Sequence, residues 1–492
     1  MGVIAKQSIK GTVYTYAGAV LGFVNTGLLM PKFLETNQVG LINLLVALTL
    51  LFANFANLGM GSVNVRIFPF FRDEKEQHHG IMMLGAGVVL AGIFLSLIVF
   101  FCLQGYFKSA SYDSSGLLSR YIFYVPVLFF LTSYIFFFSS YFRALFDALT
   151  DIFLREFLVR LLTFFALLAY IFHGVDFKGF VLLYVLAYTS PLPIMLFILK
   201  KSGQLYFRLP DKKYWHIHKK EIFKVAFWGI VAGFSGMAVA NIDKTMVTGF
   251  LGLEATGVYS VCFYFGVLII MPARALSGIS AIVVAEAWSK NDREVIRRVY
   301  KKSTVNLFLV GSLLYVGILI NLDNIFLIIP KYASGRGVII FIGAGYLFQM
   351  LGGMAGVILS TSAYYRVSSW MMLAMILLVT FSNLVFIPRL GLVGAAWASL
   401  ASIILVNVFL FLFLYVKFKL QPYNYKHLLI VALMAFSLLI NQLLPQLEFY
   451  LLDIFVRSSI IVIIYISVAY IFKISEDACR IFDVFLNKLH SK

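Results

Sequence analysis

The chain has 492 residues, of which 61% are hydrophobic and only 13% charged, and its formal net charge is +18 at pH 7. Apolar runs of about 20 residues, the length that crosses roughly 30 Å of hydrocarbon, recur along the whole sequence. This composition excludes a soluble protein of several globular domains. It predicts an all-α polytopic membrane protein, because helices satisfy their own backbone hydrogen bonds in lipid.

The apolar runs, bounded by charged residues, glycine or proline, predict about fourteen transmembrane helices. The first six are expected near residues 10–31, 38–65, 81–104, 120–142, 152–173 and 178–200. The next six are expected near residues 222–250, 256–287, 303–322, 337–362, 367–387 and 392–416. A last pair is expected near residues 427–445 and 454–473.

An internal repeat relates the two sets of six helices. The segment that starts at Phe33 (FLETNQVGLI) resembles the segment that starts at Phe250 (FLGLEATGVY), 217 positions later. A further match, between residues 177–181 and 392–396, has nearly the same offset. Six is an even number of spans, so both copies start on the same side of the membrane and form two lobes as parallel repeats. The last two helices fall outside the repeat.

The repeat predicts a domain organisation with two lobes. We expect an N-lobe at residues 1–200, a basic linker at 201–221, a C-lobe at 222–416, and the two extra spans with a cytoplasmic tail at 417–492. The linker contains KKYWHIHKK, and we expect it to lie as an amphipathic segment on an anionic cytoplasmic leaflet.

The positive charge is sorted by side of the membrane, which removes the need for a nucleic acid partner. With the N-terminus inside, 29 of the 40 Lys and Arg residues fall on the cytoplasmic side. Of all 40 basic residues, only Arg160, Lys244 and Arg274 are assigned to the interior of spans. The positive-inside rule therefore predicts a multi-pass protein with both termini in the cytoplasm.

Sequence signatures of common enzymes are missing from the chain. No Lys follows a Gly, so the core of a nucleotide-binding P-loop is absent, and His-Glu-x-x-His, Gly-x-Ser-x-Gly and Cys-x-x-Cys are absent too. We therefore expect no enzymatic activity, no cofactor and no metal.

Charged residues within spans are costly and by default mark a functional site or a buried pair. Asp243 and Lys244 lie late in the seventh span, and we assign them as candidates for ion coupling. The alternative for Asp243 is a structural ion pair with another helix. Lys244 could instead direct its ammonium group outward to the interface.

Arginine residues in the spans predict a binding site for an anionic substrate. Arg274 follows Pro272, which removes a backbone hydrogen bond, and its guanidinium fork matches phosphate oxygens. The alternative is a pair with an acidic residue. Arg66, near the cytoplasmic end of the second span, is either a second phosphate ligand or an interfacial anchor.

Three asparagines, Asn25, Asn54 and Asn57, are candidates for hydrogen bonds to sugar hydroxyls in the same cavity. Arg160 is left out of this site. Glu156 precedes it by four positions in the favourable acid-first order, which predicts a pair within one helix.

Several motifs together resemble a known group. They are LGMG at 58–61 followed by RIFP at 66–69, the segment 242–260, and GLVGAAWA at 391–398. In this order the motifs are similar to those of the bacterial polysaccharide transporter family, which includes O-antigen (Wzx-type) flippases, within the multidrug/oligosaccharidyl-lipid/polysaccharide (MOP) exporter superfamily. The resemblance covers essentially the whole chain and implies a fold like that of MATE and MurJ transporters.

The resemblance implies a flippase of the bacterial cytoplasmic (inner) membrane. Its substrate would be an undecaprenyl-diphosphate-linked oligosaccharide, an O-antigen, capsule or exopolysaccharide repeat unit. It would work by alternating access in a central cationic cavity, with H⁺ or Na⁺ as an optional coupling ion. Membrane lipids and polysaccharide assembly proteins are the other expected partners. The sequence departs from this pattern in having no basic residue deep in its first span.

Four other functions remain open. A peptidoglycan lipid-precursor flippase and a cation-coupled multidrug exporter share the expected architecture, and the exporter would favour several cavity carboxylates. An oligosaccharide polymerase or ligase would need a large periplasmic loop with catalytic residues, and the sequence contains no such loop between its predicted spans. A scaffold for glycan assembly would tolerate loss of charge at both Arg66 and Arg274.

Overall fold

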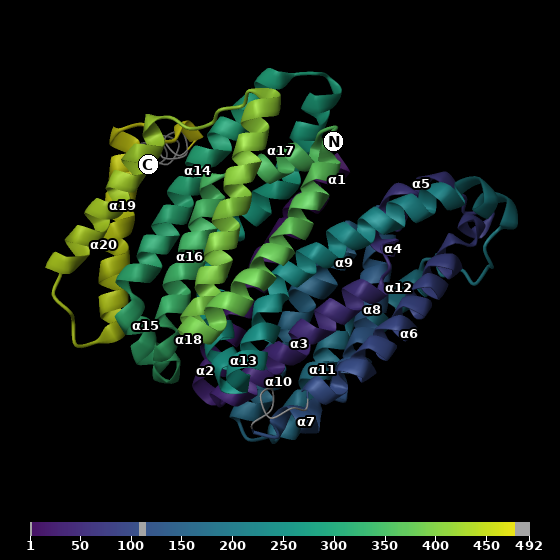
Figure 1. Ribbon diagram of the computed structural model, residues 1–492, viewed down its shortest axis with the longest axis horizontal. Coiled ribbons are helices and arrows are strands. Elements are labelled where there is room, and N and C mark those ends of the chain that lie inside the picture. Colours follow the sequence, from purple (N-terminus) through teal and green to yellow (C-terminus); the bar gives the residue numbers. More distant parts are fainter. Residues whose placement is uncertain (1, 108–114, 478–492) are drawn as a thin grey trace, which may run out of the picture. The chain divides into compact units, whose positions relative to one another are not determined.

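A computed structural model describes residues 2–107 and 115–477 of the chain. The described residues form helices joined by turns and loops, with no β-strand among them (Figure 1). Eleven helical segments of the described chain are long and apolar enough to cross a membrane. The all-α membrane fold expected from the sequence is therefore confirmed.

The chain divides into two compact units, Met1–Ser260 and Val261–Lys492. The helices of the first unit are α1 Gly2–Phe23, η1 Val24–Leu29, α2 Met30–Phe33, α3 Thr36–Ala56, α4 Met60–Arg66, α5 Phe68–Phe71, η2 Gln77–Gly80, α6 Ile81–Phe107, α7 Leu117–Tyr121, α8 Tyr124–Ala144, α9 Ala148–Ile152, η3 Phe153–Leu158, α10 Val159–Ile171, α11 Phe177–Thr189 and α12 Pro191–Lys201. The next helix, α13 Lys212–Ser289, begins in the first unit and ends in the second. Within this unit α3 packs on α6 and α8, and α10 packs on α11.

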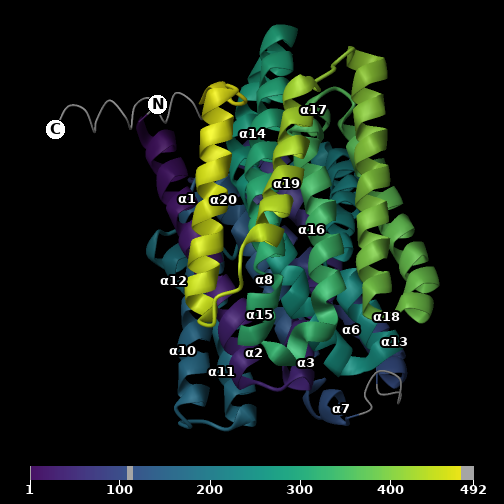
Figure 2. The same cartoon turned by 90° about the vertical axis from the view of Figure 1, so that its left-hand side faces the viewer.

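The second unit contains the end of α13 and the remaining helices. They are α14 Arg293–Ile320, α15 Leu322–Ile328, η4 Pro330–Gly335, α16 Arg336–Leu351, α17 Ala355–Thr361, α18 Tyr365–Phe418, α19 Tyr425–Leu443 and α20 Tyr450–Ile471. Figure 1 shows α14, α16 and α18 side by side, and Figure 2 shows α19 and α20 running along each other beside α14. The two C-terminal helices predicted near 427–445 and 454–473 correspond to α19 and α20.

Two helices contain a reversal of chain direction at a glycine. The apolar parts of α13 and α18 extend over 76 and 54 residues, far more than the roughly 20 that one crossing needs. Gly252 in α13 has φ 83° and ψ −179°, and Gly391 in α18 has φ 60° and ψ −138°, conformations that a side chain disfavours. Both glycines fall in the gaps predicted between spans. The fifth span, predicted near residues 152–173, falls in a helical stretch at 148–171 that is not among the eleven, and the count of fourteen stays a prediction.

The two copies of the repeated segment contact each other in a reciprocal way. A Cβ atom on Gly40 would collide with the carbonyl oxygen of Leu253, and a Cβ atom on Gly257 would collide with that of Thr36. The repeat pairs Thr36 with Leu253 and Gly40 with Gly257, so each copy presents its glycine to the equivalent carbonyl of the other. This is the arrangement of a local two-fold axis, and it requires helices without side chains at the point of closest approach.

The predicted basic linker is partly helical, and an ion pair and a hydrogen bond join it to the loop after α5. Residues 212–221 form the first turns of α13 and continue directly into the seventh predicted span. Before them, Arg208 pairs with Glu76 at 2.5 Å, and the backbone N–H of Asp211 donates to the carbonyl of His79. Residues 208–211 therefore follow a defined path across the loop at 72–80.

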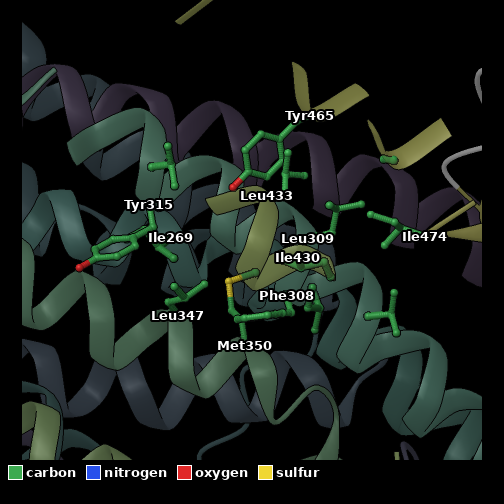
Figure 3. Close-up of a cluster of buried hydrophobic side chains, with 14 of the residues drawn as sticks. Ile269, Phe308, Leu309, Tyr315, Leu347, Met350, Ile430, Leu433, Tyr465 and Ile474 are labelled. Atoms are coloured by element: carbon green, nitrogen blue, oxygen red, sulfur yellow. The ribbon is translucent and has the colours of Figure 1, made fainter. Parts of the chain in front are cut away.

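An apolar cluster holds the second unit together around α14 (Figure 3). Phe308 and Leu309 of α14 pack with Met350 of α16, Ile430 of α19 and Tyr465 of α20. These side chains are less than a tenth exposed. The cluster explains how α19 and α20, which lie outside the repeat, are joined to the rest of the second unit.

A buried ion pair joins α20 to α15 and to the end of α19. Arg457 Nε donates to Asp453 Oδ2 at 2.7 Å, one turn earlier in α20, and both side chains are about 5% exposed. Asn324 of α15 donates to the same carboxylate at 2.6 Å, and Arg457 also donates to Asn441 Oδ1 and the Pro445 carbonyl. The network satisfies both charges without solvent, so its role is structural.

Replacing either glycine of the reciprocal contact by alanine should lower stability. We expect Gly40→Ala and Gly257→Ala each to cost about 1–3 kcal/mol, because the added carbon forces two backbones apart. The melting temperature of the purified protein measures this effect. Gly87→Ala on α6 is the matched control, since a Cβ atom there meets nothing within 4 Å.

The double variant tests the reciprocity. Once the helices have moved apart to accommodate one Cβ atom, the second Cβ atom should lower the stability by less. The loss of stability in the double variant should therefore be smaller than the sum of the two single losses. Fully additive costs would show that the two glycines pack independently.

Removing Arg457 should destabilise the end of the second unit. Arg457→Leu leaves Asp453 buried without its cation, and we expect a loss of about 3–5 kcal/mol in stability. Adding Asp453→Asn to Arg457→Leu should restore part of the lost stability, which thermal unfolding in detergent measures. An Arg457→Leu protein as stable as the parent would contradict a buried ion pair.

Candidate transport site

A cavity of about 400 Å³ lies within the second unit. Its walls come from α13 after the Gly252 reversal, from α16, from α17 and from both arms of α18. The polar residues that line it include Arg274, Gln349 and Asn407, and four methionines, Met354, Met371, Met372 and Met375, also line it. The cavity is therefore bordered by helical segments that are distant in sequence, as expected for a site inside a bundle.

A helix break forms one wall of this cavity. α16 ends at Leu351 and α17 begins at Ala355, and Gly353 between them has a φ of +57°. A Cβ atom on Gly353 would lie 2.7 Å from Thr304 Cγ2, so the turn passes close against α14. Irregular backbone within a bundle is tolerated where it is buried or lines a cavity, and interrupted helices mark substrate sites in transporters.

Arg274 is the only charged side chain among the described residues that line the cavity. It is exposed, and within the described part of the chain no carboxylate lies within 4 Å of its guanidinium group. The helix continues through Pro272 to Ser289. The acidic partner considered as an alternative is thus missing from the described residues, and the guanidinium fork is available to a ligand.

Neutral polar groups complete the lining. Asn407 Nδ2 donates to the Ile403 carbonyl at 2.8 Å, and its Oδ1 is directed at Gly352, where a Cβ atom would come within 2.9 Å of it. Gln349 lies exposed near the end of α16. The cavity combines one cation with amide groups and with flexible methionine side chains, which adapt to irregular ligands.

The first unit contains a second helix break, between α3 and α4. Leu58 and Gly59 have φ values of 44° and 76°. Asn57 bridges the break, since its Oδ1 accepts from Gly61 N at 2.9 Å and its Nδ2 donates to the Ser133 carbonyl at 3.4 Å. Both functional groups of this buried asparagine are occupied by the protein.

The other two predicted residues near this break are more accessible. Asn54 is half-buried, and its Oδ1 would lie 3.1 Å from a Cβ atom on Gly233 of α13. Arg66 is exposed in the last turn of α4. The break, Asn54 and Arg66 therefore belong to one segment of the first unit.

Asn25 lies in a π-helical segment, η1, and is only 3% exposed. Its Nδ2 donates to the Arg160 carbonyl at 2.8 Å, which ties η1 to α10. The predicted pair between Glu156 and Arg160 is confirmed, with Arg160 Nη2 lying 2.9 Å from Glu156 Oε2. The amide donor of Asn25 thus connects two helices, and its predicted contact with a sugar hydroxyl stays a prediction.

Asp243 is 3% exposed, and its Oδ2 accepts a hydrogen bond from the Tyr259 hydroxyl at 2.9 Å. Tyr259 comes from the other arm of the hairpin that reverses at Gly252. Thr248 and Thr256 also join the two arms, with their hydroxyl oxygens 2.7 Å apart. Lys244 is half-buried, one position after Asp243. The predicted coupling carboxylate thus sits in a polar cluster that spans the hairpin.

Sequence reasoning missed the two amide side chains of the cavity and the buried charges outside it. Gln349 and Asn407 are polar positions in otherwise apolar spans, and that contrast was the available signal. Asp151, which is 1% exposed, lies 3.1 Å from Arg143 and 2.8 Å from Arg155.

The missed carboxylate also had a signal in the sequence. The acid-first spacing of four residues that predicts the pair of Glu156 and Arg160 also relates Asp151 to Arg155. The same spacing relates the two residues of the buried pair in α20. A search for this spacing across all spans would therefore have found all three pairs.

These features define a multi-pass helical membrane protein with interrupted helices and a cationic cavity. A family model described as "Polysaccharide biosynthesis protein" matches residues 4–276, more than half of the chain. The chain belongs to this family. Among curated proteins, none matches the chain.

Solved structures of MOP transporters share the fold. "Lipid II flippase MurJ, inward closed conformation" has a TM-score of 0.72 and 14% identity over 94% of this chain and 98% of that chain. An inward-facing multidrug resistance MATE family transporter has a TM-score of 0.60 and 14% identity over 83% and 94%. A MOP superfamily transporter from Pyrococcus furiosus has a TM-score of 0.51 and 12% identity over 85% and 97%. The chain thus has the MOP fold expected from its motifs.

Proposed function

We propose that this protein is a flippase for an undecaprenyl-diphosphate-linked oligosaccharide, an O-antigen, capsule or exopolysaccharide repeat unit, in the bacterial inner membrane. The observation that carries the proposal is the cavity, in which Arg274 is the one charge among the described lining residues. A guanidinium group binds a phosphate through two parallel hydrogen bonds. Amide groups such as those of Gln349 and Asn407 suit the hydroxyl groups of sugars.

The physical problem that such a protein solves fits this cavity. A diphosphate and a sugar chain cannot enter hydrocarbon unaided, whereas the polyprenyl tail can remain there. A polar cavity within a helical bundle replaces water around the head group during the crossing. Membership of the polysaccharide biosynthesis protein family supports the same substrate class.

The charge of the cavity argues against an exporter of cationic drugs. Among its described lining residues there is no carboxylate, and a cationic ligand would face Arg274. The choice of an O-antigen-type flippase over a peptidoglycan-precursor flippase rests on the family match, since similarity to MurJ concerns the fold. Expression of the chain in strains that lack each flippase would test this choice through recovery of surface glycan or of growth.

We assign four more of the predicted residues to two roles. Arg66 and Asn54, beside the first helix break, are a second contact region for the head group. Asp243, with Lys244 beside it, is the candidate for coupling to H⁺ or Na⁺. A carboxylate buried within a span marks a site where a proton or a cation can be exchanged.

Loss of the Arg274 charge should reduce transport without loss of protein. We expect Arg274→Gln to lower surface glycan about tenfold or more, since hydrogen bonds to a charged group are worth about 1.5–3 kcal/mol. Arg274→Lys keeps the positive charge but loses the fork of the guanidinium group, so its surface glycan should lie between that of the wild type and that of Arg274→Gln. Surface glycan and the amount of protein in the membrane are measured together.

Arg366→Gln is the matched control for this experiment. Arg366 is an exposed arginine at the start of α18 and does not line the cavity. Unchanged export by Arg274→Gln, with Arg66→Gln also unchanged, would rule out the cationic site.

Asp243 can be tested by separating coupling from stability. If it couples transport to an ion, Asp243→Asn should abolish the dependence of transport in proteoliposomes on an H⁺ or Na⁺ gradient. Tyr259→Phe removes the hydroxyl donor but keeps the carboxylate, so gradient dependence should persist. If both variants lower the melting temperature equally and both keep the dependence, Asp243 has a structural role.

A further inference from the structure

A second cavity, of about 330 Å³, lies in the second unit and shares no lining residue with the Arg274 cavity. It is formed by the start of α14, the start of α19 and the segment after α20. These three chain segments lie on the side that the charge distribution predicts to be cytoplasmic. The function proposed above makes no use of this cavity.

Cations dominate its lining. Four of them are Arg297, Arg298 and Lys301 on α14 and Lys426 on α19. The fifth, Lys302, lies 3.3 Å from Glu476 and 3.5 Å from Asp477, so it is already paired with the carboxylates of the segment after α20.

The segment after α20 is held in place by its own contacts. Asn306 Nδ2 donates to Asp477 Oδ2 at 2.8 Å, and Ser475 Oγ donates to Asn306 Oδ1 at 2.7 Å. Lys426 Nζ donates to the Lys473 carbonyl at 3.0 Å. One wall of the cavity is therefore built by a defined network.

Arg297, Arg298 and Lys301 have no carboxylate within 4 Å in the described part of the chain. Glu294, one turn earlier on α14, also lines the cavity but does not approach them to ion-pair distance. Arg297 and Lys301 are four positions apart, and like charges at this spacing repel each other. A bound anion would relieve this repulsion.

Apolar side chains flank the cavity on α19 and at the end of α20. Tyr425 and Leu428, on either side of Lys426, are 65% and 73% exposed, and Ile471 and Phe472, just before Lys473, are 69% and 54% exposed. A basic site bordered by exposed apolar side chains at a membrane interface suits an anionic lipid, whose head group and tails meet these two surfaces.

We propose that this cavity binds a phosphate-bearing anion through Arg297, Arg298 and Lys301. An anionic phospholipid head group and a soluble phosphate present the same oxygens to these side chains. The exposed apolar border favours the lipid as the source. Its phosphate would lie between α14 and α19 and join them at this end of the unit.

The test uses the full-length protein in detergent micelles, with phosphatidylglycerol, phosphatidylcholine or inorganic phosphate added. Native mass spectrometry reports lipid binding, and thermal unfolding reports stabilisation by each probe. We expect the wild type to prefer phosphatidylglycerol over phosphatidylcholine by about tenfold or more, the gain from charge-assisted hydrogen bonds. The double change Arg297→Gln with Arg298→Gln should abolish this preference.

The matched control is Arg293→Gln with Arg366→Gln, which removes two exposed arginines of the same unit that do not line the cavity. It should keep the preference for phosphatidylglycerol. Lys301→Gln is the second variant, and a partial loss of the preference is expected. Stabilisation by inorganic phosphate that is equally sensitive to the double change would support the site and assign it to a soluble anion.

Two results would overturn the proposal. One is a wild type that binds neither phosphatidylglycerol more tightly than phosphatidylcholine nor inorganic phosphate. The other is a double variant that keeps the wild-type preference. Either result leaves the proposed flippase function intact, because glycan export is measured separately.

Discussion

The reciprocal contact between the two repeated turns is the constraint on which the rest of the first unit depends. Gly40 and Gly257 each face the carbonyl that occupies the other's equivalent position, so a single sequence motif makes the same contact twice. A duplicated segment can do this only if its two copies meet around a local two-fold axis. The helical segments that begin at Thr36 and at Leu253 then start at fixed positions. The contact also explains why glycine is needed at both places, since any side chain would separate the backbones.

Several charges inside the bundle are paired with a residue in the same continuous helical stretch. Asp453 with Arg457, Asp151 with Arg155, and Glu156 with Arg160 are all pairs four residues apart. Each pair needs no second helix to place its partner, and such local pairing allows charge inside an apolar bundle at low cost in free energy. Arg274 differs because the described chain offers it no such acid, and this contrast identifies it as the candidate ligand-binding residue.

Much of the fold follows from the sequence because bilayer thickness and backbone hydrogen bonding leave few choices. The predicted spans near 81–104, 427–445 and 454–473 correspond to α6, α19 and α20 within a few residues. The breaks inside spans were not predictable in the same way. Leu58 adopts a positive φ although it is an apolar residue with a side chain, and the turn after Leu351 passes close against Thr304. Tertiary contacts decide such positions.

Site residues were harder still to predict, because a sequence shows which polar residues exist but not which of them are already hydrogen-bonded within the protein. Asn25, Asn57 and Asn407 each donate an amide hydrogen bond to a backbone carbonyl, yet of these three only Asn407 lines the cavity of Arg274, together with Gln349, and a search for charges passes over both.

The composition of that cavity suits a carrier whose ligand must also leave. A guanidinium group together with neutral amides holds a phosphate through a few hydrogen bonds, which is weaker than a cluster of several cations would be. Methionine side chains change shape at little cost, so the part of the cavity that they line can accept different sugars. The one feature that all substrates of the proposed class share, the phosphate next to the lipid, meets the one charge among the described lining residues. Specificity for the class and tolerance for the sugar can therefore come from different walls of the same site.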